Sequence, residues 1–151
     1  PSARPIMHGH LPVFESETFY TMCSGGLGFG LPAAVGVALG KPGARVIALV
    51  GDGSAMYAIQ ALWSAAQLAL PVTVVILKNR RYAALYEFAR IFGYRPDEHV
   101  PGTDLPDLDF VALAAAQGMK GLRVDAAEQL RPALMQALQS TAPMLVEIEV
   151  A

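Results

Sequence analysis

The sequence predicts an α/β fold with three layers, α/β/α, around a mainly parallel central sheet, and three observations support this class. Residues 46–50 and 72–77 form two apolar runs rich in β-branched side chains, which is typical of strands buried on both faces of a parallel sheet. The residues between these runs repeat apolar side chains at helical spacing. A glycine-containing turn follows the first run directly, at the strand end where such sheets bind ligands.

Length and composition fit one domain that normally packs against another protein surface. The chain has 151 residues, of which 54% are hydrophobic and 16% are charged. This composition excludes a disordered chain and is richer in apolar surface than a free-standing monomer needs. We therefore expect a hidden interface and a homodimer or homotetramer. A net charge of −2 without clustered cations argues against nucleic acid and membranes as partners.

Targeting and redox signals predict a soluble, cytoplasmic protein. No apolar run reaches the roughly 18–20 residues of a membrane span, and the first residues lack the features of a signal peptide. A single cysteine, Cys23, rules out an internal disulfide and fits a reducing compartment. The start at Pro1, without a methionine, suggests a piece of a longer chain.

In chain order, residues 1–20 predict an extended segment that leads into a domain at 21–151, because they carry prolines and no clear period. His8 and His10 could hold a metal. A pair spaced i, i+2 in a Pro/Gly-rich stretch is more typical of a surface loop, which is the interpretation we favour.

A glycine-dense segment comes next. Four glycines within 25–30 let the main chain pass close to another object, either a ligand or a packed helix. Residues 31–39 then predict a helix of small side chains, with Pro32 tolerated in its first turn and Gly40 as its stop.

The turn after the first strand is the candidate ligand-binding element. Gly51 and Gly53 permit a tight turn and a close approach of the backbone, and they place Asp52 at the carboxyl end of the strand. Ser54 is a candidate N-cap for a helix that continues to Leu70.

The second strand brings another polar residue to the same place. A helix between two parallel strands returns the chain to its starting edge, so Asn79 should lie near Asp52. A carboxylate and an amide oxygen suit magnesium, and free N–H groups at a helix N-terminus suit phosphate. The sequence therefore predicts a site for magnesium and a diphosphate.

The remaining elements look like scaffold. The expected order is a helix at 82–92, a loop at 93–107, a helix at 110–114 capped by Asp109 and ended by Gly118, a strand at 121–124, a helix at 126–140 and a strand at 144–150. Glu147 and Glu149 alternate with apolar neighbours, so we expect them to face solvent at an edge rather than to form a catalytic pair.

The glycine segment, the Gly51-Asp52-Gly53-Ser54 turn and Asn79 together resemble the thiamine-diphosphate-binding motif, which runs from G-D-G to a closing N-N. Residues 23–150 look like the C-terminal, diphosphate-binding domain of thiamine diphosphate-dependent 2-oxo acid decarboxylases and carboligases, and are most similar to the benzoylformate decarboxylases. The chain departs from the motif at Lys78, where the first Asn usually stands, and at Arg80, where Gly is common.

This resemblance implies that the chain binds thiamine diphosphate and magnesium. The metal ligands would be the Asp52 carboxylate, the Asn79 side-chain oxygen and the Arg81 backbone carbonyl, while Leu27 would prop the cofactor in a bent shape. The full set of implied cofactor-binding positions is Gly25, Leu27, Gly51, Asp52, Gly53, Ser54, Asn79, Tyr82, Ala83 and Ala84.

The resemblance also implies decarboxylation of a 2-oxo acid. Leu85 and Phe88 would line the substrate pocket and suit an aryl side chain, so aromatic acids such as benzoylformate come first. The glutamate that activates the cofactor would belong to the N-terminal, pyrimidine-binding domain of a neighbouring subunit. The catalytic residues therefore stay unknown from this chain, and the isolated domain is expected to be inactive.

Other functions stay open at this point. The chain could belong to an acetolactate synthase-like or benzaldehyde lyase-like carboligase, to a nucleotide-binding Rossmann-like module, or to a non-catalytic domain of the same fold. A Rossmann module expects G-x-G-x-x-G and an acidic residue after the second strand. Here the turn has no third glycine and the second strand ends in Lys78-Asn79, while Asp52 and Asn79 argue against a purely structural role.

Overall fold

A parallel four-stranded sheet forms the middle of the molecule. The structure is a computed structural model that describes residues 4–150. The strands are β1 (Val46–Gly51), β2 (Val72–Lys78), β3 (Lys120–Val124) and β4 (Met144–Glu149), and they lie in the order β1-β2-β4-β3 with every neighbouring pair parallel. All strands therefore end at the same edge of the sheet, where ligands of open α/β sheets bind.

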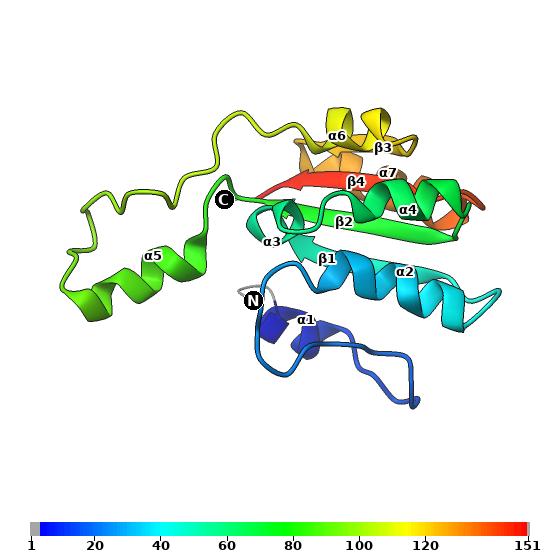
Figure 1. Ribbon diagram of the computed structural model, residues 1–151, viewed down its shortest axis with the longest axis horizontal. Helices are drawn as coiled ribbons and strands as arrows, with labels where there is room; N and C mark the ends of the chain where they lie inside the picture. The colour runs from blue at the N-terminus through cyan, green and yellow to red at the C-terminus, as the bar shows by residue number, and fades with distance from the viewer. Residues whose placement is uncertain (1–3, 151) are drawn as a thin grey trace.

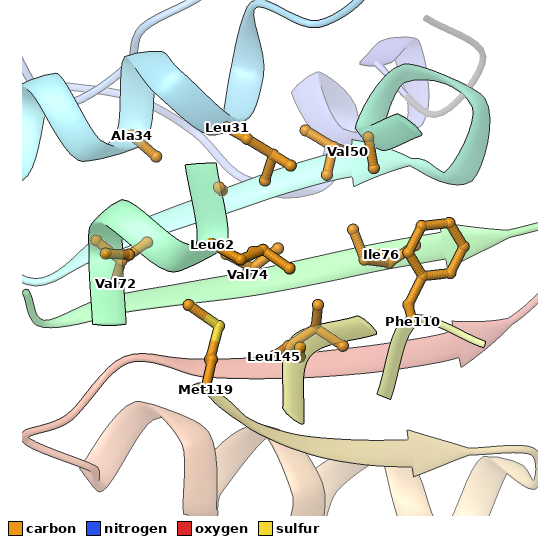
Figure 2. Close-up of a cluster of buried hydrophobic side chains, with 14 of the residues drawn as sticks. Leu31, Ala34, Val50, Leu62, Val72, Val74, Ile76, Phe110, Met119 and Leu145 are labelled. Atoms are coloured by element: carbon orange, nitrogen blue, oxygen red, sulfur yellow. The ribbon is translucent and has the colours of Figure 1, made fainter. Parts of the chain in front are cut away.

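Helices cover the sheet from both sides. Helices α2 (Gly30–Gly40), α4 (Ala61–Gln67) and α6 (Phe110–Ala116) share one face, and α7 (Ala127–Gln139) packs on the other (Figure 1). Figure 2 shows Leu31, Leu62 and Phe110 from the first face lying over side chains of the central strands. The predicted three-layer α/β/α class is confirmed, because helices pack on both faces of the sheet.

The coverage of β1 is less complete than the sequence predicted. Ile47 and Leu49 are 57% and 40% exposed, whereas Ala48 and Val50 between them are buried. The reason is the position of α7, which packs on β3 and β4 at the far side of the sheet and does not reach β1. The prediction that β1 is buried on both faces is therefore wrong for this chain, and the open face exposes contiguous apolar area.

The single helix predicted from Ser54 to Leu70 is also wrong. The chain instead forms α3 (Asp52–Met56) and α4, joined by i→i+3 turns in which the Ala58 N–H donates to the Ala55 carbonyl. Helix α3 begins at Asp52, so Ser54 is not its N-cap, and Gly51 occupies that position without a side-chain bond. The break rotates α4, which buries Leu62 fully and leaves Trp63 56% exposed.

The N-terminal segment is not extended throughout. It contains helix α1 (Arg4–His10), in which the His8 ring lies edge-on against Phe19 at 5.1 Å between ring centroids. Its first three residues lie outside the described residues, and the division at residue 20 stays a prediction. Within 4–150, no cluster of three or more His, Cys, Asp or Glu residues could hold a metal ion, and no helix is long and apolar enough to cross a membrane.

The segment after β2 leaves the sheet and returns. Helix α5 (Ala83–Ala89) and the 3₁₀ turn η1 (Arg90–Phe92) stand apart from the sheet, and a long loop leads back to α6 (Figure 1). Asp109 caps α6 as predicted, because its carboxylate accepts the Ala112 N–H at 2.8 Å. The Arg123 guanidinium, and then this N–H, hold the pKa of the Asp109 carboxyl below its usual range.

Glu147 is buried, which contradicts the expectation that it faces solvent at an edge. Strand β4 is an interior strand, between β2 and β3, and the Glu147 side chain is 1% exposed beneath the start of α6. Its carboxylate accepts bonds from Lys78 Nζ and Arg123 Nε, each at 3.1 Å, and from the Phe110 N–H at 2.8 Å. Apolar alternation cannot distinguish a solvated glutamate from a buried one whose partners come from other strands.

We predict that Glu147→Ala destabilises the protein by about 3 kcal/mol, because it leaves Lys78 and the Phe110 N–H without their buried acceptor. The free energy of unfolding in urea is the measurement. Glu87→Ala, which removes an exposed carboxylate from α5, should change it by less than about 0.5 kcal/mol. Equal effects of the two substitutions would show that the buried carboxylate does not stabilise the sheet edge.

Candidate functional site

The turn between β1 and α3 is closed by a tyrosine ring. A Cβ atom at Gly53 would lie 2.5 Å from both Cδ1 and Cε1 of Tyr82, so no larger residue fits without moving the ring. The Gly53 backbone thus approaches the Tyr82 ring closely, while its approach to a ligand stays a prediction. Gly51, the other glycine of the turn, adopts an extended conformation at the end of β1 that does not require glycine.

The Asp52 carboxylate is the centre of the site. It is 3% exposed, and its Oδ1 accepts the Gly53 N–H at 2.8 Å. Its Oδ2 accepts two N–H groups from the loop after β2, those of Asn79 at 3.0 Å and Arg80 at 2.6 Å. Within residues 4–150, no Lys, Arg or His side chain forms an ion pair with it. The site therefore holds a buried negative charge that backbone dipoles alone offset.

Asn79 lies where the sequence predicted, at the same sheet edge as Asp52. Its side-chain Oδ1 accepts the Arg81 N–H at 3.2 Å, which closes a short Asx-type turn. Carbonyl oxygens have two lone pairs, so one stays available to a ligand. The Asn79 backbone N–H thus bonds the Asp52 carboxylate, and the side-chain oxygens of both residues can still accept further bonds.

Arg81 forms a single antiparallel bridge with Asp104. The bonds that flank it run from the Tyr82 N–H to the Thr103 carbonyl and from the Leu105 N–H to the Arg80 carbonyl, each at 2.7 Å. The N–H and carbonyl of Arg81 itself therefore point away from the 103–105 segment. Among the described residues, no donor bonds the Arg81 carbonyl, which leaves it free to act as an acceptor.

The glycine segment packs against this turn. The Gly28 N–H donates to Ser54 Oγ at 3.3 Å, and a Cβ at Gly28 would lie 2.9 Å from the Tyr57 Cβ. This contact and a φ of +87° both account for Gly28. Gly25 has a φ of +69° with open space around it, so its need for glycine is conformational. Leu27, between them, is half-buried.

Tyr82 links the turn to α5. Its ring lies edge-on to Tyr57, with 6.3 Å between centroids. Burial, and then the charges of Tyr57 and Asp52, raise the pKa of the Tyr82 phenol above its usual value. The phenol therefore keeps its proton at neutral pH and can donate a hydrogen bond. Ala83 and Ala84, which begin α5 beside it, are half-buried and exposed respectively.

Leu85 and Phe88 are not brought to Asp52 by this chain. Both lie on α5, where they are 48% and 53% exposed, and Phe88 contacts Phe92 edge-on at 5.5 Å between centroids. Helix α5 stands apart from the sheet (Figure 1), and neither side chain is among the residues that line the cavity at the carboxyl ends of β2, β4 and β3.

Sequence reasoning missed a charged group of residues beside the site. Lys78, Arg80, Arg123, Glu147 and Glu149 line a cavity of about 760 Å³ at the carboxyl ends of β2, β4 and β3. Their charges are paired with one another at 2.6–3.9 Å. The available signal was the pair of departures at Lys78 and Arg80, because Lys78 pairs in register with Glu149 of the last strand and Arg80 follows two residues later.

The family model described as "Thiamine pyrophosphate enzyme, C-terminal TPP binding domain" matches residues 3–148. The chain belongs to the thiamine pyrophosphate (TPP) enzyme family. TPP is another name for thiamine diphosphate, so the resemblance read from the turn and Asn79 is confirmed at the level of the family.

Relatives of this TPP-binding domain include decarboxylases and synthases. Benzoylformate decarboxylase of Pseudomonas aeruginosa is 47% identical over 134 residues, covering 89% of this chain and 25% of the relative. The acetolactate synthase catalytic subunit of Saccharomyces cerevisiae is 38% identical over 137 residues, covering 89% and 19%. The chain thus spans about a quarter or less of the length of these curated relatives.

Solved structures agree with this assignment. Benzoylformate decarboxylase of Polynucleobacter necessarius superposes with a TM-score of 0.92 at 37% identity, covering 100% of this chain and 29% of that one. The 4-hydroxybenzoylformate decarboxylase of Rhodococcus jostii gives a TM-score of 0.78 at 50% identity, covering 84% and 24%. The sheet order and flanking helices are therefore those of a TPP-binding domain.

The residues present fit this cofactor. A buried carboxylate with no cationic partner among residues 4–150, beside amide and carbonyl oxygens with spare lone pairs, is a donor set for a hard divalent cation. Such a cation in turn accepts phosphate oxygens as further ligands, which is what a diphosphate offers. Helix α3 has only five residues, so backbone N–H groups and the cation, rather than a helix dipole, would hold the phosphates.

We predict that Gly53→Ala destabilises the protein by about 1–3 kcal/mol, because the new methyl group overlaps the Tyr82 ring. Gly36→Ala, in the middle of α2 with open space around it, should be neutral or stabilising by up to about 1 kcal/mol. Urea unfolding of both variants is the measurement. Adding Tyr82→Ala should relieve most of the loss at Gly53, and additive effects of the two changes would contradict this contact.

Proposed function

We propose that this chain holds the diphosphate half of TPP through a magnesium ion, within an enzyme that decarboxylates an aromatic 2-oxo acid. The observation that carries the proposal is the Asp52 carboxylate, which is buried, bound by three backbone N–H groups and paired with no cation of the described chain. Burial of such a charge is costly unless a positive partner is present.

Magnesium suits the role of this positive partner better than a cationic side chain would. It prefers near-octahedral oxygen coordination, and it commonly takes one or two carboxylates or amides together with substrate phosphates. The Asp52 carboxylate, the Asn79 Oδ1 atom and the Arg81 carbonyl would supply the protein ligands. The Arg81 carbonyl supports this set because it is turned away from the 103–105 segment and accepts no bond within 4–150.

TPP, when bound, would supply the chemistry as an electron sink for decarboxylation. The part of this chain is to bind and orient. Gly25, Leu27, Gly51, Gly53 and Ser54 would contact the cofactor from the two packed loops. Tyr82, Ala83 and Ala84 would border it from the start of α5, where the Tyr82 phenol keeps its proton. The glutamate that activates the cofactor is proposed to come from the N-terminal domain of a neighbouring subunit, so the isolated domain is expected to be inactive.

An aromatic substrate is supported by the relatives. The benzoylformate decarboxylase and the 4-hydroxybenzoylformate decarboxylase are 47% and 50% identical to this chain. Leu85 and Phe88 are exposed apolar side chains on one face of α5, and they would face the substrate once another domain covers them. The second candidate is a carboligase of the acetolactate synthase type, which the 38% identity to the yeast catalytic subunit favours.

Assembly into a homodimer or homotetramer is supported by the uncovered apolar side chains. Ile47 and Leu49 on β1, and Phe88 and Ile91 after β2, are 40–72% exposed. Such area is typical of surfaces that another chain or domain covers. A cytoplasmic location is consistent with the single, unpaired Cys23.

We predict that Asp52→Asn in the full-length enzyme weakens magnesium-dependent TPP binding at least about 100-fold, because the site loses the charge that offsets the metal. Isothermal titration with TPP at fixed magnesium gives the affinity. Asp97→Asn, on the exposed loop after η1, is the matched control and should bind as wild type does. Unchanged binding by Asp52→Asn would refute the assignment of Asp52 as a metal ligand.

We also predict that the full-length enzyme prefers benzoylformate to pyruvate, and that Phe88→Ala lowers this preference about 10- to 200-fold, the value of one apolar contact in a pocket. The ratio of kcat/KM for the two substrates is the measurement. Leu39→Ala, at the exposed end of α2, should leave the ratio unchanged. If Phe88→Ala also leaves it unchanged, Phe88 does not set the substrate choice.

A further inference from the structure

Ion pairs tie the loop that carries Asn79 to strand β4. We call the residues that form them the clasp: Lys78, Arg80, Glu147 and Glu149. Arg80 Nη2 lies 2.6 Å from Glu149 Oε1. Lys78 Nζ lies 3.1 Å from Glu147 Oε1 and 3.9 Å from Glu149 Oε2. The residues on both sides of Asn79 thus share Glu149 as a partner, and Lys78 also pairs with Glu147.

Arg80 needs an anchor because its backbone is left-handed, with a φ of +58°. A side chain with a Cβ atom disfavours this region, which glycine enters freely. This conformation allows two backbone hydrogen bonds of Arg80 to form at once. It directs the Arg80 N–H to Asp52 Oδ2 at 2.6 Å while the Arg80 carbonyl accepts the Leu105 N–H at 2.7 Å. Because φ and ψ set the relative orientation of these two peptide groups, both bonds depend on it.

Without the Glu149 pair, the Asp52 carboxylate would be a second anionic partner for the Arg80 guanidinium. The backbone N–H of Arg80 is bonded to the Asp52 carboxylate, so a side chain released from Glu149 could swing toward that same carboxylate. A cation there would oppose the entry of a metal ion. Glu149 holds the guanidinium on β4 instead.

We propose that Arg80 and Glu149 are positioning residues for the loop that binds the metal. Their ion pair keeps Arg80 in the left-handed conformation and keeps its guanidinium away from Asp52, so that the loop is already in its binding geometry before the cofactor arrives. This inference rests on the proposed role of Asp52 and Asn79 as magnesium ligands.

The pair differs from an ordinary surface ion pair, which contributes little. Its Glu149 side chain is 34% exposed and lies beside Lys78, which is 11% exposed and bonded to the buried Glu147. Those neighbours restrict Glu149 to the β4 side of the loop. Arg80 is itself 62% exposed, but its acceptor already has a cationic neighbour on β4, which lowers the side-chain entropy that the pair must lose on forming.

The first test is hydrogen exchange in the full-length enzyme without cofactor. Glu149→Gln should speed exchange of the Asn79 and Arg80 amides about tenfold, because their bonds to Asp52 open more often once the left-handed residue is released. Asp125→Asn, on the rim of the same cavity but outside the clasp, should exchange as wild type does. Equal exchange in wild type and Glu149→Gln would overturn the proposal.

The second test compares affinities for magnesium and TPP by isothermal titration. Glu149→Gln and Arg80→Ala should each weaken binding about tenfold, whereas Arg80→Gly should bind within about threefold of wild type, since glycine needs no anchor. Glu149→Gln added to Arg80→Gly should have no further effect. If Glu149→Gln weakens binding equally in both backgrounds, Glu149 acts without Arg80 and the proposal is wrong.

These tests separate the clasp from the proposed function. A wild-type enzyme that binds TPP without any dependence on magnesium would refute the metal site, and the exchange rates without cofactor would still decide whether the clasp orders the loop. If Glu149→Gln does not fold, the contrast between Ala and Gly at the exposed Arg80 decides the question, and equal affinities of those two variants would overturn the proposal.

Discussion

The buried carboxylate of Asp52 is the interaction on which the site depends. It stands at the junction of β1 and α3, and it bonds N–H groups of its own turn and of the loop after β2. A single side chain thus fixes the relation between two segments that the parallel sheet brings to one edge. No cation from residues 4–150 pairs with its charge, which supports the proposal that the junction is a ligand site rather than a structural bridge.

Much of the fold could be predicted, because strand periodicity and caps are local signals. The strands, α2 and the Asp109 cap follow from residues that are close in sequence. The burial of Glu147 and the open face of β1 could not be predicted, since they depend on strand order and on where α7 packs. The break between α3 and α4 was missed because the apolar spacing is nearly continuous across 54–70, while tertiary packing buries Leu62 and turns Trp63 outward.

In the site, too, the features that follow from the order of the strands could be predicted, and those that depend on residues far away in the sequence could not. The convergence of Asp52 and Asn79 followed from strand connectivity alone. The roles of Gly53 and Lys78 did not, because Gly53 is confined by the Tyr82 ring and Lys78 by glutamates on a strand that comes about seventy residues later. Departures from a motif at Lys78 and Arg80 therefore acquire a physical meaning only once their partners on β4 are known.

The central claim is that Asp52 and Asn79 hold a divalent cation at this sheet edge. Its most direct test is a crystal structure of the full-length enzyme with TPP and manganese in place of magnesium, in which anomalous scattering locates the metal. The account predicts one peak about 2.0–2.3 Å from a carboxylate oxygen of Asp52 and from Asn79 Oδ1. A peak among the carboxylates of the neighbouring cavity, with Asp52 still bonded only to backbone N–H groups, would contradict it.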